Sequence, residues 1–254
     1  MKRLILISFI LFVGQNFLFS QTNSNQKSSE LTFLVDITDE EIFSQIRSDF
    51  EQSLPTFFQT TGLGKIKALE KFTLAIAPIN ATGELRLTSK SISIPRKGMS
   101  LQEERKLGNP QPLMSMLKQQ LNAFDSIKTA HNEQSYIMDI VLKTIAQANE
   151  SAGRNVIVVL SDLLEYSPVH NMYKKIPTSN QEIEQLINNI DPIILRQAKI
   201  KLQLGCDPEV IVVFKQKAGS RNGRELKRFW TGFLNKIGIT TVIFIDNFTQ
   251  NPQI

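Results

Sequence analysis

Short apolar segments, separated by stretches with helical periodicity, constrain the fold of this chain more than any other feature. Most of these segments lack the strict alternation of a half-exposed strand, which is typical of strands covered by helices on both faces. They occupy residues 31–36, 71–80, 155–162, 209–214 and 239–246. The order of strands and helices predicts an α/β fold with a doubly wound, mostly parallel six-stranded sheet and helices on both faces.

The sixth strand is expected at residues 84–95, where apolar and polar positions alternate. An Ala-Thr-Gly sequence at residues 81–83 separates it from the preceding strand, as a tight hairpin turn would. The pattern therefore predicts one antiparallel edge strand.

Apolar residues recur at helical spacing in much of the intervening sequence. This periodicity covers residues 42–54, 113–124, 136–148, 183–190 and 226–237. Pro55 is expected to end the first of these helices, because proline lacks the backbone N–H that the helix requires. Residues 163–178 show no regular pattern, and residues 193–205 fit either a helix or an extra edge strand.

The chain is expected to contain one domain, at residues 31–250, after an export signal at residues 1–21 and a flexible polar segment at residues 22–30. Lys2 and Arg3 precede an apolar run that stops at Val13, which is too short to span a bilayer. The mature chain is therefore predicted to be periplasmic, secreted or surface-associated, with no transmembrane span. The leader looks bacterial.

Composition excludes several classes of protein. A single cysteine, Cys206, permits neither an internal disulfide nor a cysteine-built zinc site. The two histidines, His131 and His170, are far apart and are expected on the surface or in loops, without a catalytic role. Loss of Lys2 and Arg3 with the leader lowers the formal net charge from +5 to +3, which is too mild to indicate nucleic-acid binding.

Oxygen-bearing side chains gather where the apolar segments end. Asp36 ends the first segment and Asp162 ends a later one, while Thr38 and Glu40 follow Asp36 at two-residue steps. Ser135 lies near the start of a predicted helix. Ligands bind at the carboxyl ends of strands in such sheets, and oxygen groups suit a hard divalent cation. The pattern predicts a cation site.

A simpler interpretation gives these acids a structural role. Thr38 or Asp39 would cap the following helix, and Glu40 and Glu41 would favour its positive end. The sequence leaves this interpretation open beside the cation site.

These residues resemble the metal-ion-dependent adhesion site of the von Willebrand factor type A domain. In that family an Asp-x-Ser/Thr-x-Ser motif ends the first strand, a Thr comes from a later loop, and an Asp follows the fourth strand. The resemblance implies a site for Mg, Mn or Ca, built from Asp36, Thr38, Glu40, Ser135 and Asp162.

Two departures from the family pattern affect this site. Glu40 places a long carboxylate where the family has a small hydroxyl, and it would ligate directly, act through water, or occupy the place of a partner's acid. Ser135 stands in for the family's Thr and competes for that role with Thr82 and Thr129.

A basic stripe is expected near the C-terminus, where Arg221, Arg224 and Arg228 recur at helical spacing. A solvated helix face is the default interpretation, and contact with an anionic partner is the functional one.

The sequence therefore suggests an exported, non-enzymatic interaction module that binds a protein partner, with a divalent cation as the bridge. One alternative is a metal-assisted phosphoesterase that uses Asp36. The Asp36-Ile37-Thr38 sequence lacks the second acid of the haloacid-dehalogenase motif, and no Gly-x-Ser-x-Gly motif is present. Another alternative is a structural subunit with a degenerate metal site.

Overall fold

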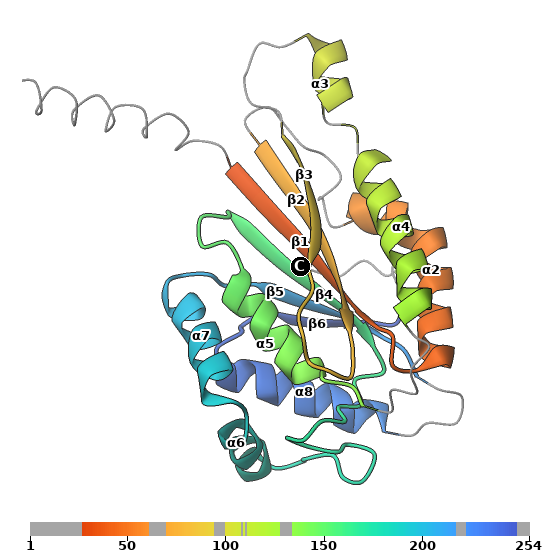
Figure 1. Cartoon of the computed structure of the whole chain (residues 1–254). Coiled ribbons are helices and arrows are strands. Elements are labelled where there is room, and N and C mark those ends of the chain that lie inside the picture. The colour runs from red at the N-terminus through yellow and green to blue at the C-terminus, as the bar shows by residue number, and fades with distance from the viewer. Residues whose placement is uncertain are drawn as a thin grey trace, which may run out of the picture.

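A computed structural model describes residues 27–60, 70–93, 100–107, 109, 111–127, 134–216 and 222–247. Its strands form one six-stranded sheet in the order β3-β2-β1-β4-β5-β6, in which only β3 is antiparallel (Figure 1). The strands are β1 (Lys27–Asp36), β2 (Glu70–Ile79), β3 (Thr88–Ser93), β4 (Arg154–Ser161), β5 (Glu209–Phe214) and β6 (Val242–Ile245). The predicted sheet, with one antiparallel edge strand, is confirmed.

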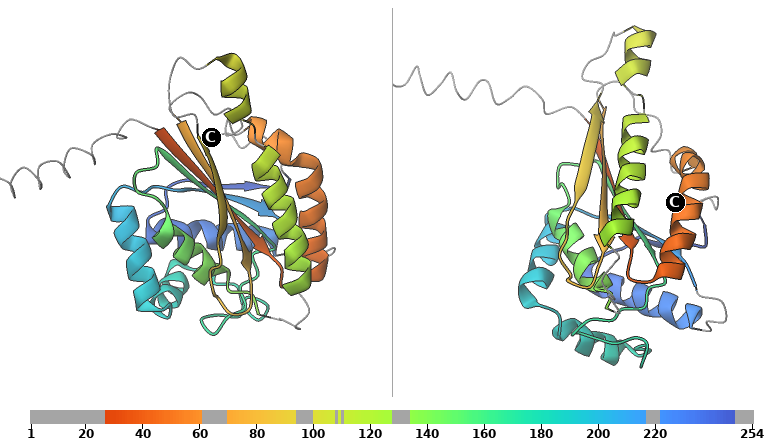
Figure 2. Two further views of the ribbon diagram at one scale, coloured as in Figure 1. Left: turned by 45° about the horizontal axis from the view of Figure 1, so that its top comes forward. Right: turned by 45° about the vertical axis from the view of Figure 1, so that its right-hand side comes forward.

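Helices cover both faces of this sheet, as predicted. They are α2 (Glu40–Thr60), α3 (Leu101–Leu107), α4 (Gln111–Ile127), α5 (Ile137–Gln147), α6 (Asn180–Asn188), α7 (Pro192–Gln203) and α8 (Gly223–Ile237). Helices α2 and α4 pack on one face, while α5 and α8 pack on the other, with α7 beside α5 and α6 beside α8 (Figure 2).

Strand β1 shows how the sequence builds these two layers. Successive side chains of a strand point to opposite faces. Phe33 therefore packs toward α2, where its ring lies 5.0 Å from that of Phe50, and Leu34 packs in the core on the α5 side. Both residues are fully buried.

Helix α2 continues past Pro55, so the predicted stop there is wrong. A proline inside a helix costs about 3 kcal/mol. Phe57, beyond the proline, is fully buried, and its ring centroid lies 6.0 Å from that of Phe33. Burial of a side chain of this size contributes about 1.5–3 kcal/mol, which offsets most of that cost.

Two further segments differ from the sequence expectation or resolve it. Residues 27–30, expected within the flexible segment 22–30, belong to β1, where Lys27 pairs with Glu70 of β2. Sheet pairing uses only backbone groups, so a polar sequence does not prevent it. Residues 192–203 form helix α7, whose N-cap Asp191 accepts a hydrogen bond from the backbone N–H of Ile193.

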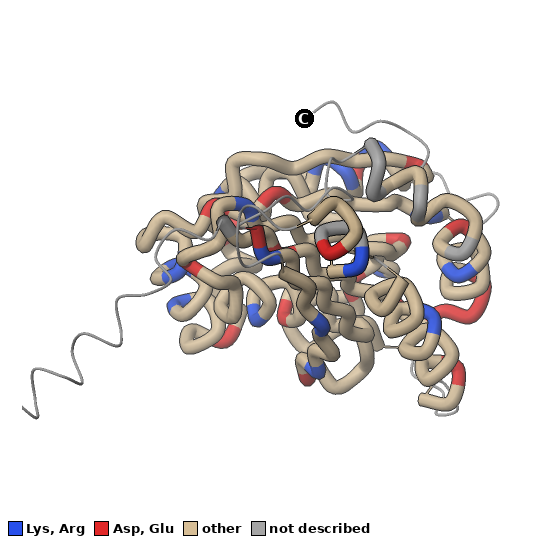
Figure 3. The backbone as a smooth tube through the Cα atoms, turned by 90° about the horizontal axis from the view of Figure 1, so that it is seen from above, with Lys and Arg blue, Asp and Glu red and all other residues tan. Residues whose placement is uncertain are grey.

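Three expectations about the rest of the chain lie partly or wholly outside the described residues. The export signal at residues 1–21 lies wholly outside them. Residues 22–26 of the predicted flexible segment and residues 248–250 of the predicted domain also lie outside. Within the part that the structure describes, no helix is long and apolar enough to cross a membrane. Basic and acidic residues are interspersed along the backbone in Figure 3.

A partly buried ion pair joins α2 to the end of β5 near the carboxyl edge of the sheet. The ammonium of Lys215, which follows β5, pairs with Asp49 of α2 and donates a hydrogen bond to the carbonyl oxygen of Asp246 at 2.8 Å. The Lys215 side chain is only 10% exposed, and that of Asp49 is 33% exposed. Loss of one partner from a buried pair is costly because a charge remains without its counterion.

We expect Asp49→Ala to lower the free energy of unfolding by about 2–3 kcal/mol, less than for a fully buried pair because Asp49 is partly hydrated. Lys215→Met should cost less, because water can solvate the remaining Asp49. Urea denaturation of both variants and of the double variant measures this. The double variant should recover most of the stability that Asp49→Ala loses, and additive losses would contradict the role given to the pair.

Candidate functional site

The candidate site lies at the carboxyl ends of β1 and β4, where the strand order changes direction. From β1 the chain proceeds outward to β2 and β3, and then returns to β4 on the other side of β1. Such a switch point leaves a crevice in which ligands of doubly wound sheets bind. Val35 pairs with Leu160, so the next residues, Asp36 and Ser161, end neighbouring strands.

Asp36 is the centre of this site. It is 1% exposed and accepts hydrogen bonds at both carboxylate oxygens. Oδ1 accepts from the backbone N–H of Thr38 at 3.0 Å and from its Oγ1 at 2.6 Å. Oδ2 accepts from Oγ of Ser161 at 2.7 Å and from Oγ of Ser135 at 3.4 Å. Hydroxyls from three separate segments therefore converge on one buried carboxylate.

Burial raises the pKa of Asp36 above its ordinary value, because a charge is poorly solvated inside the protein. The hydrogen bonds from Thr38, Ser161 and Ser135 act in the opposite direction, since they stabilise the carboxylate. A cation beside the carboxylate would add to that stabilisation and lower the pKa further.

Three residues are candidates for the hydroxyl that the adhesion-site pattern takes from a later loop. Of these, the structure brings Ser135 to Asp36. Ser135 is 2% exposed, and its backbone pairs with Tyr166 through hydrogen bonds of 2.9 and 3.0 Å. Thr82 lies in the turn between β2 and β3, where its hydroxyl donates to Asn80. Thr129 lies outside the described residues.

The two remaining predicted ligands occupy different environments. Asp162 directly follows Ser161, is 6% exposed, and its Oδ1 accepts a hydrogen bond from the backbone N–H of Leu164 at 3.0 Å. Glu40 is exposed in the first turn of α2. Within the described ranges, no three Asp, Glu, His or Cys side chains are grouped so that they could hold a metal ion, and a site here therefore depends on hydroxyl ligands.

Asp39 performs the capping role that the simpler interpretation proposed. Its Oδ1 accepts a hydrogen bond from the backbone N–H of Ile42 at 3.1 Å, and its carbonyl oxygen accepts from Phe43. Asp36 instead bonds to Thr38 and to hydroxyls from other segments. Capping of α2 therefore does not account for Asp36.

Hydroxyl ligands are compatible with the hydrogen bonds around Asp36. Each serine or threonine hydroxyl has one proton to donate and two lone pairs. The hydroxyls of Thr38 and Ser135 donate to Asp36 and keep lone pairs that a hard cation can use. The residues present therefore fit a magnesium-like ion that retains part of its water shell.

The loop after β4 is held in an uncommon backbone conformation. Leu163 has φ of 64°, although it is not a glycine, and it is 1% exposed. Ser161 Oγ accepts a hydrogen bond from the backbone N–H of Leu163 at 2.8 Å, and Trp230 Nε1 of α8 donates to its carbonyl oxygen at 2.9 Å. These contacts fix the position of the intervening Asp162.

Sequence reasoning missed two titratable residues in the irregular loop at residues 163–178. Glu165 is 1% exposed, and its Oε2 accepts a hydrogen bond from the backbone N–H of Met138 at the start of α5. Burial raises the pKa of this carboxyl to about 8. Tyr173 is 55% exposed. Its partial burial is the main cause of its raised pKa, and the negative charges of Asp162, Asp36 and Asp39 raise the pKa further.

Ser161, which is not among the site residues predicted from the sequence, has a recognisable sequence signal. It directly precedes Asp162 at the end of an apolar strand, where side chains reach the carboxyl edge. Glu165 and Tyr173 lie in a segment without periodicity, so only the fold of the loop brings Tyr173 near Asp36 and Asp162 and Glu165 against the start of α5.

The predicted basic stripe is described only in part. Arg224 and Arg228 are exposed on α8, and Arg221 lies outside the described residues. Between them, the ammonium of Lys227 lies 5.2 Å from the ring centroid of Phe214 and 3.4 Å from Oδ1 of Asp246. Contact of this surface with an anionic partner stays a prediction.

The fold and the position of the site define a doubly wound α/β protein, and its six-stranded, mostly parallel sheet fits a von Willebrand factor type A-like fold. No protein-family model and no curated protein matches the chain. Among solved structures, it is similar to the human COPII-coat protein Sec24c at 10% identity and a TM-score of 0.43. The match covers 86% of this chain and 30% of that one.

Proposed function

We propose that this protein is an exported, non-enzymatic interaction module that binds a protein partner at the carboxyl edge of its sheet through a divalent cation. The cation would be held by the hydroxyls of Thr38 and Ser135 and by the carboxylates of Asp36 and Asp162, in the manner of a divergent metal-ion-dependent adhesion site. The convergence of three hydroxyls on buried Asp36 carries this proposal.

The exposed position of Glu40 supports the proposal that this residue does not bind the cation directly. It is exposed at the start of α2 rather than buried beside Asp36. A ligand set of hydroxyls with two carboxylates leaves the cation more electrophilic than a set with three carboxylates. An acidic side chain of the partner would then complete the cation's coordination.

The environments of His170, Cys206 and the two serines support an interaction role over hydrolysis, because none of them is arranged as an activated nucleophile in the part of the chain that the structure describes. His170 binds the carbonyl oxygen of Lys175 through Nε2 at 2.7 Å. Cys206 is 2% exposed, and burial raises the pKa of its thiol, which disfavours the reactive thiolate. Ser135 and Ser161 donate to the same carboxylate, Asp36, and neither forms a described bond to a histidine.

Thermal unfolding of the purified protein tests the cation site. We expect millimolar magnesium, manganese or calcium to stabilise the wild type relative to EDTA, by about 2.7 kcal/mol at one hundred times the dissociation constant. Asp36→Asn should abolish this increment, because it removes the central charge. Ser135→Ala keeps that charge and should reduce the increment with less effect on folding.

Asp39→Ser is the matched control for these variants. It removes a carboxylate next to the site but retains a side chain that caps α2. The cation should therefore stabilise this variant as it stabilises the wild type. An absent shift in the wild type, or an equal shift in Asp36→Asn, would show that the acids serve only the fold.

A further inference from the structure

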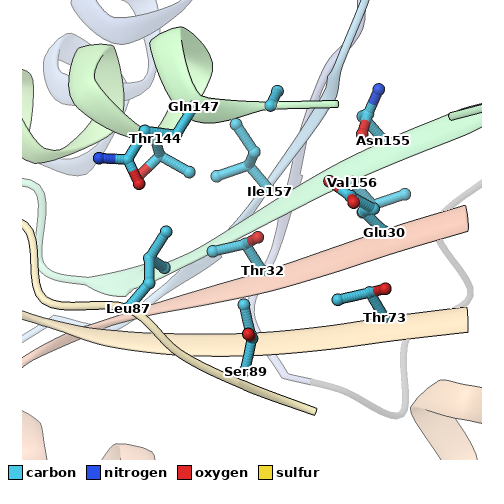
Figure 4. A pocket seen from close by; sticks show the side chains of 12 residues that line it. Glu30, Thr32, Thr73, Leu87, Ser89, Thr144, Gln147, Asn155, Val156 and Ile157 are labelled. Carbon is cyan, nitrogen blue, oxygen red and sulfur yellow. The ribbon is translucent and has the colours of Figure 1, made fainter. Parts of the chain in front are cut away.

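A pocket lies on the α5 face of the sheet, at the opposite end of β1 and β4 from Asp36. Figure 4 shows its lining side chains, which come from four strands, the segment before β3, and the end of α5. Its volume is about 150 Å³. In a sheet covered by helices this face is normally apolar. Here much of the lining is polar, which calls for a physical explanation.

The strand register arranges the lining in two rows. Glu30 of β1 pairs with Thr73 of β2 on one side and with Asn155 of β4 on the other, which gives a polar row across three strands. Two residues further along β1, Thr32 pairs with Ala75 and Ile157 in a more apolar row. Neighbouring side chains in such rows lie about 5 Å apart.

Asn155 presents an unsatisfied acceptor to this pocket. It is 6% exposed, and its Nδ2 donates to the carbonyl oxygen of Asn149 at 3.1 Å and lies 3.5 Å from the sulfur of Cys206. Its Oδ1 is buried and has no hydrogen-bond partner among the residues that the structure describes. A buried acceptor without a partner costs about 1–3 kcal/mol, so a donor at this position is favoured.

The electrostatic character of the pocket favours a positively charged donor. Glu30 is the one charged residue in the described lining, which contains no Lys, Arg or His. The last turn of α5 contributes Thr144, Gln147 and Ala148 to the lining, and the C-terminal end of a helix carries partial negative charge. The Thr144 hydroxyl donates to Ile140, which leaves its lone pairs available as acceptors.

We propose that this pocket binds a primary alkylammonium group, from either a free amine or a lysine side chain. The three N–H donors would reach the carboxylate of Glu30, a hydroxyl of the polar row and, after the Asn155 side chain turns toward the cavity, its Oδ1. The alkyl chain would lie along the row of Thr32 and Ile157, toward Leu87. A cavity of this volume accommodates about six non-hydrogen atoms, close to the size of n-butylammonium.

Titration of the ¹⁵N-labelled full chain with n-butylammonium chloride, followed by NMR, tests this proposal. Sodium chloride keeps the ionic strength constant, and 1-butanol serves as a neutral probe of similar size. We expect n-butylammonium to shift the amide signals of Glu30, Thr73 and Asn155 and to bind at least about tenfold more tightly than 1-butanol, since the charge strengthens the hydrogen bonds.

Glu30→Gln keeps the shape of the side chain and should remove the preference for the charged probe. Thr73→Val is a second, milder variant and should weaken the binding of both probes. Glu184→Gln removes a carboxylate from α6, far from the pocket, and should leave binding unchanged. Equal binding of the two probes, or no change at the pocket amides, would overturn the proposal.

Nα-acetyl-lysine methylamide distinguishes the two sources of the group. If it binds as n-butylammonium does, the pocket can accept a lysine side chain of a partner. If only n-butylammonium binds, the ligand is a free amine. This site shares no residue with the proposed cation site, so either proposal can fail without the other.

Discussion

Trp230→Ala is expected to lower the free energy of unfolding by about 3–5 kcal/mol, the range for removal of a large aromatic side chain from a core. Trp230 is 2% exposed on α8, and its ring centroid lies 5.6 Å from that of Phe229 and 5.5 Å from that of Phe233. Its Nε1 also donates to the carbonyl oxygen of Leu163. The substitution therefore creates a cavity and releases the loop that positions Asp162.

Trp230→Phe separates these two effects. It keeps an aromatic ring in the core but lacks the N–H donor, so we expect a smaller loss of about 1–2 kcal/mol. Urea denaturation gives both values. If Leu163 is positioned by this hydrogen bond, the cation-dependent stabilisation of Trp230→Phe should also fall below that of the wild type. A loss under about 1 kcal/mol for Trp230→Ala would contradict the packing described here.

Glu165→Gln is expected to remove much of the pH dependence of stability between about pH 4.5 and pH 8. Burial raises the pKa of Glu165 from 4.5 to about 8 in the folded protein. Within this window the folded state holds a proton that the unfolded state has lost. The free energy of unfolding therefore falls as pH rises, by up to about 1.4 kcal/mol per pH unit, and levels off above the folded pKa.

The glutamine variant stays neutral throughout and can still accept the hydrogen bond from the backbone N–H of Met138. It should therefore be more stable than the wild type at pH 8 and similar to it near pH 5. Denaturant unfolding at several pH values measures the difference. A residual slope is expected, because burial also raises the pKa values of Asp36 and Asp139. Parallel curves for the two proteins would contradict a buried, protonated Glu165.

Asp139→Asn provides a control for this interpretation. Burial is the largest cause of the raised pKa of Glu165, and the hydrogen bonds from Ser167 and Met138 lower this pKa. The negative charge of Asp139 raises it further. Its removal should shift the midpoint of the pH dependence downward without abolishing it. The midpoint would be unchanged if Glu165 were not the group that titrates.

The elements of the fold were largely predictable because hydrophobic periodicity reports burial directly. The run at residues 155–162 gave a central strand, and the alternation at residues 84–95 gave the antiparallel edge strand. Predictions failed where tertiary packing outweighed local preference. Helix α2 continues through Pro55 because Phe57 is buried beyond it, and residues 27–30 extend β1 through backbone pairing.

The candidate site was predictable in kind but not in full. Asp36 and Thr38 are close in sequence, and their hydrogen bonds are local. Only the place of Ser135 near a helix start favours it in the sequence, and the fold brings it to Asp36 across 99 positions of the chain. Glu165 lies in a loop whose path depends on contacts with α5 and α8, so no local sequence pattern predicts its burial.

The sequence by itself determined the layers of this protein and the carboxyl edge at which its acids gather, because strand and helix periods and strand-end residues are local properties. Tertiary structure alone decided which hydroxyls meet Asp36 and that the Glu165 carboxyl is buried. It also aligned Glu30, Thr73 and Asn155 in one row. Those arrangements depend on strand register and helix packing, which join residues that are distant along the chain.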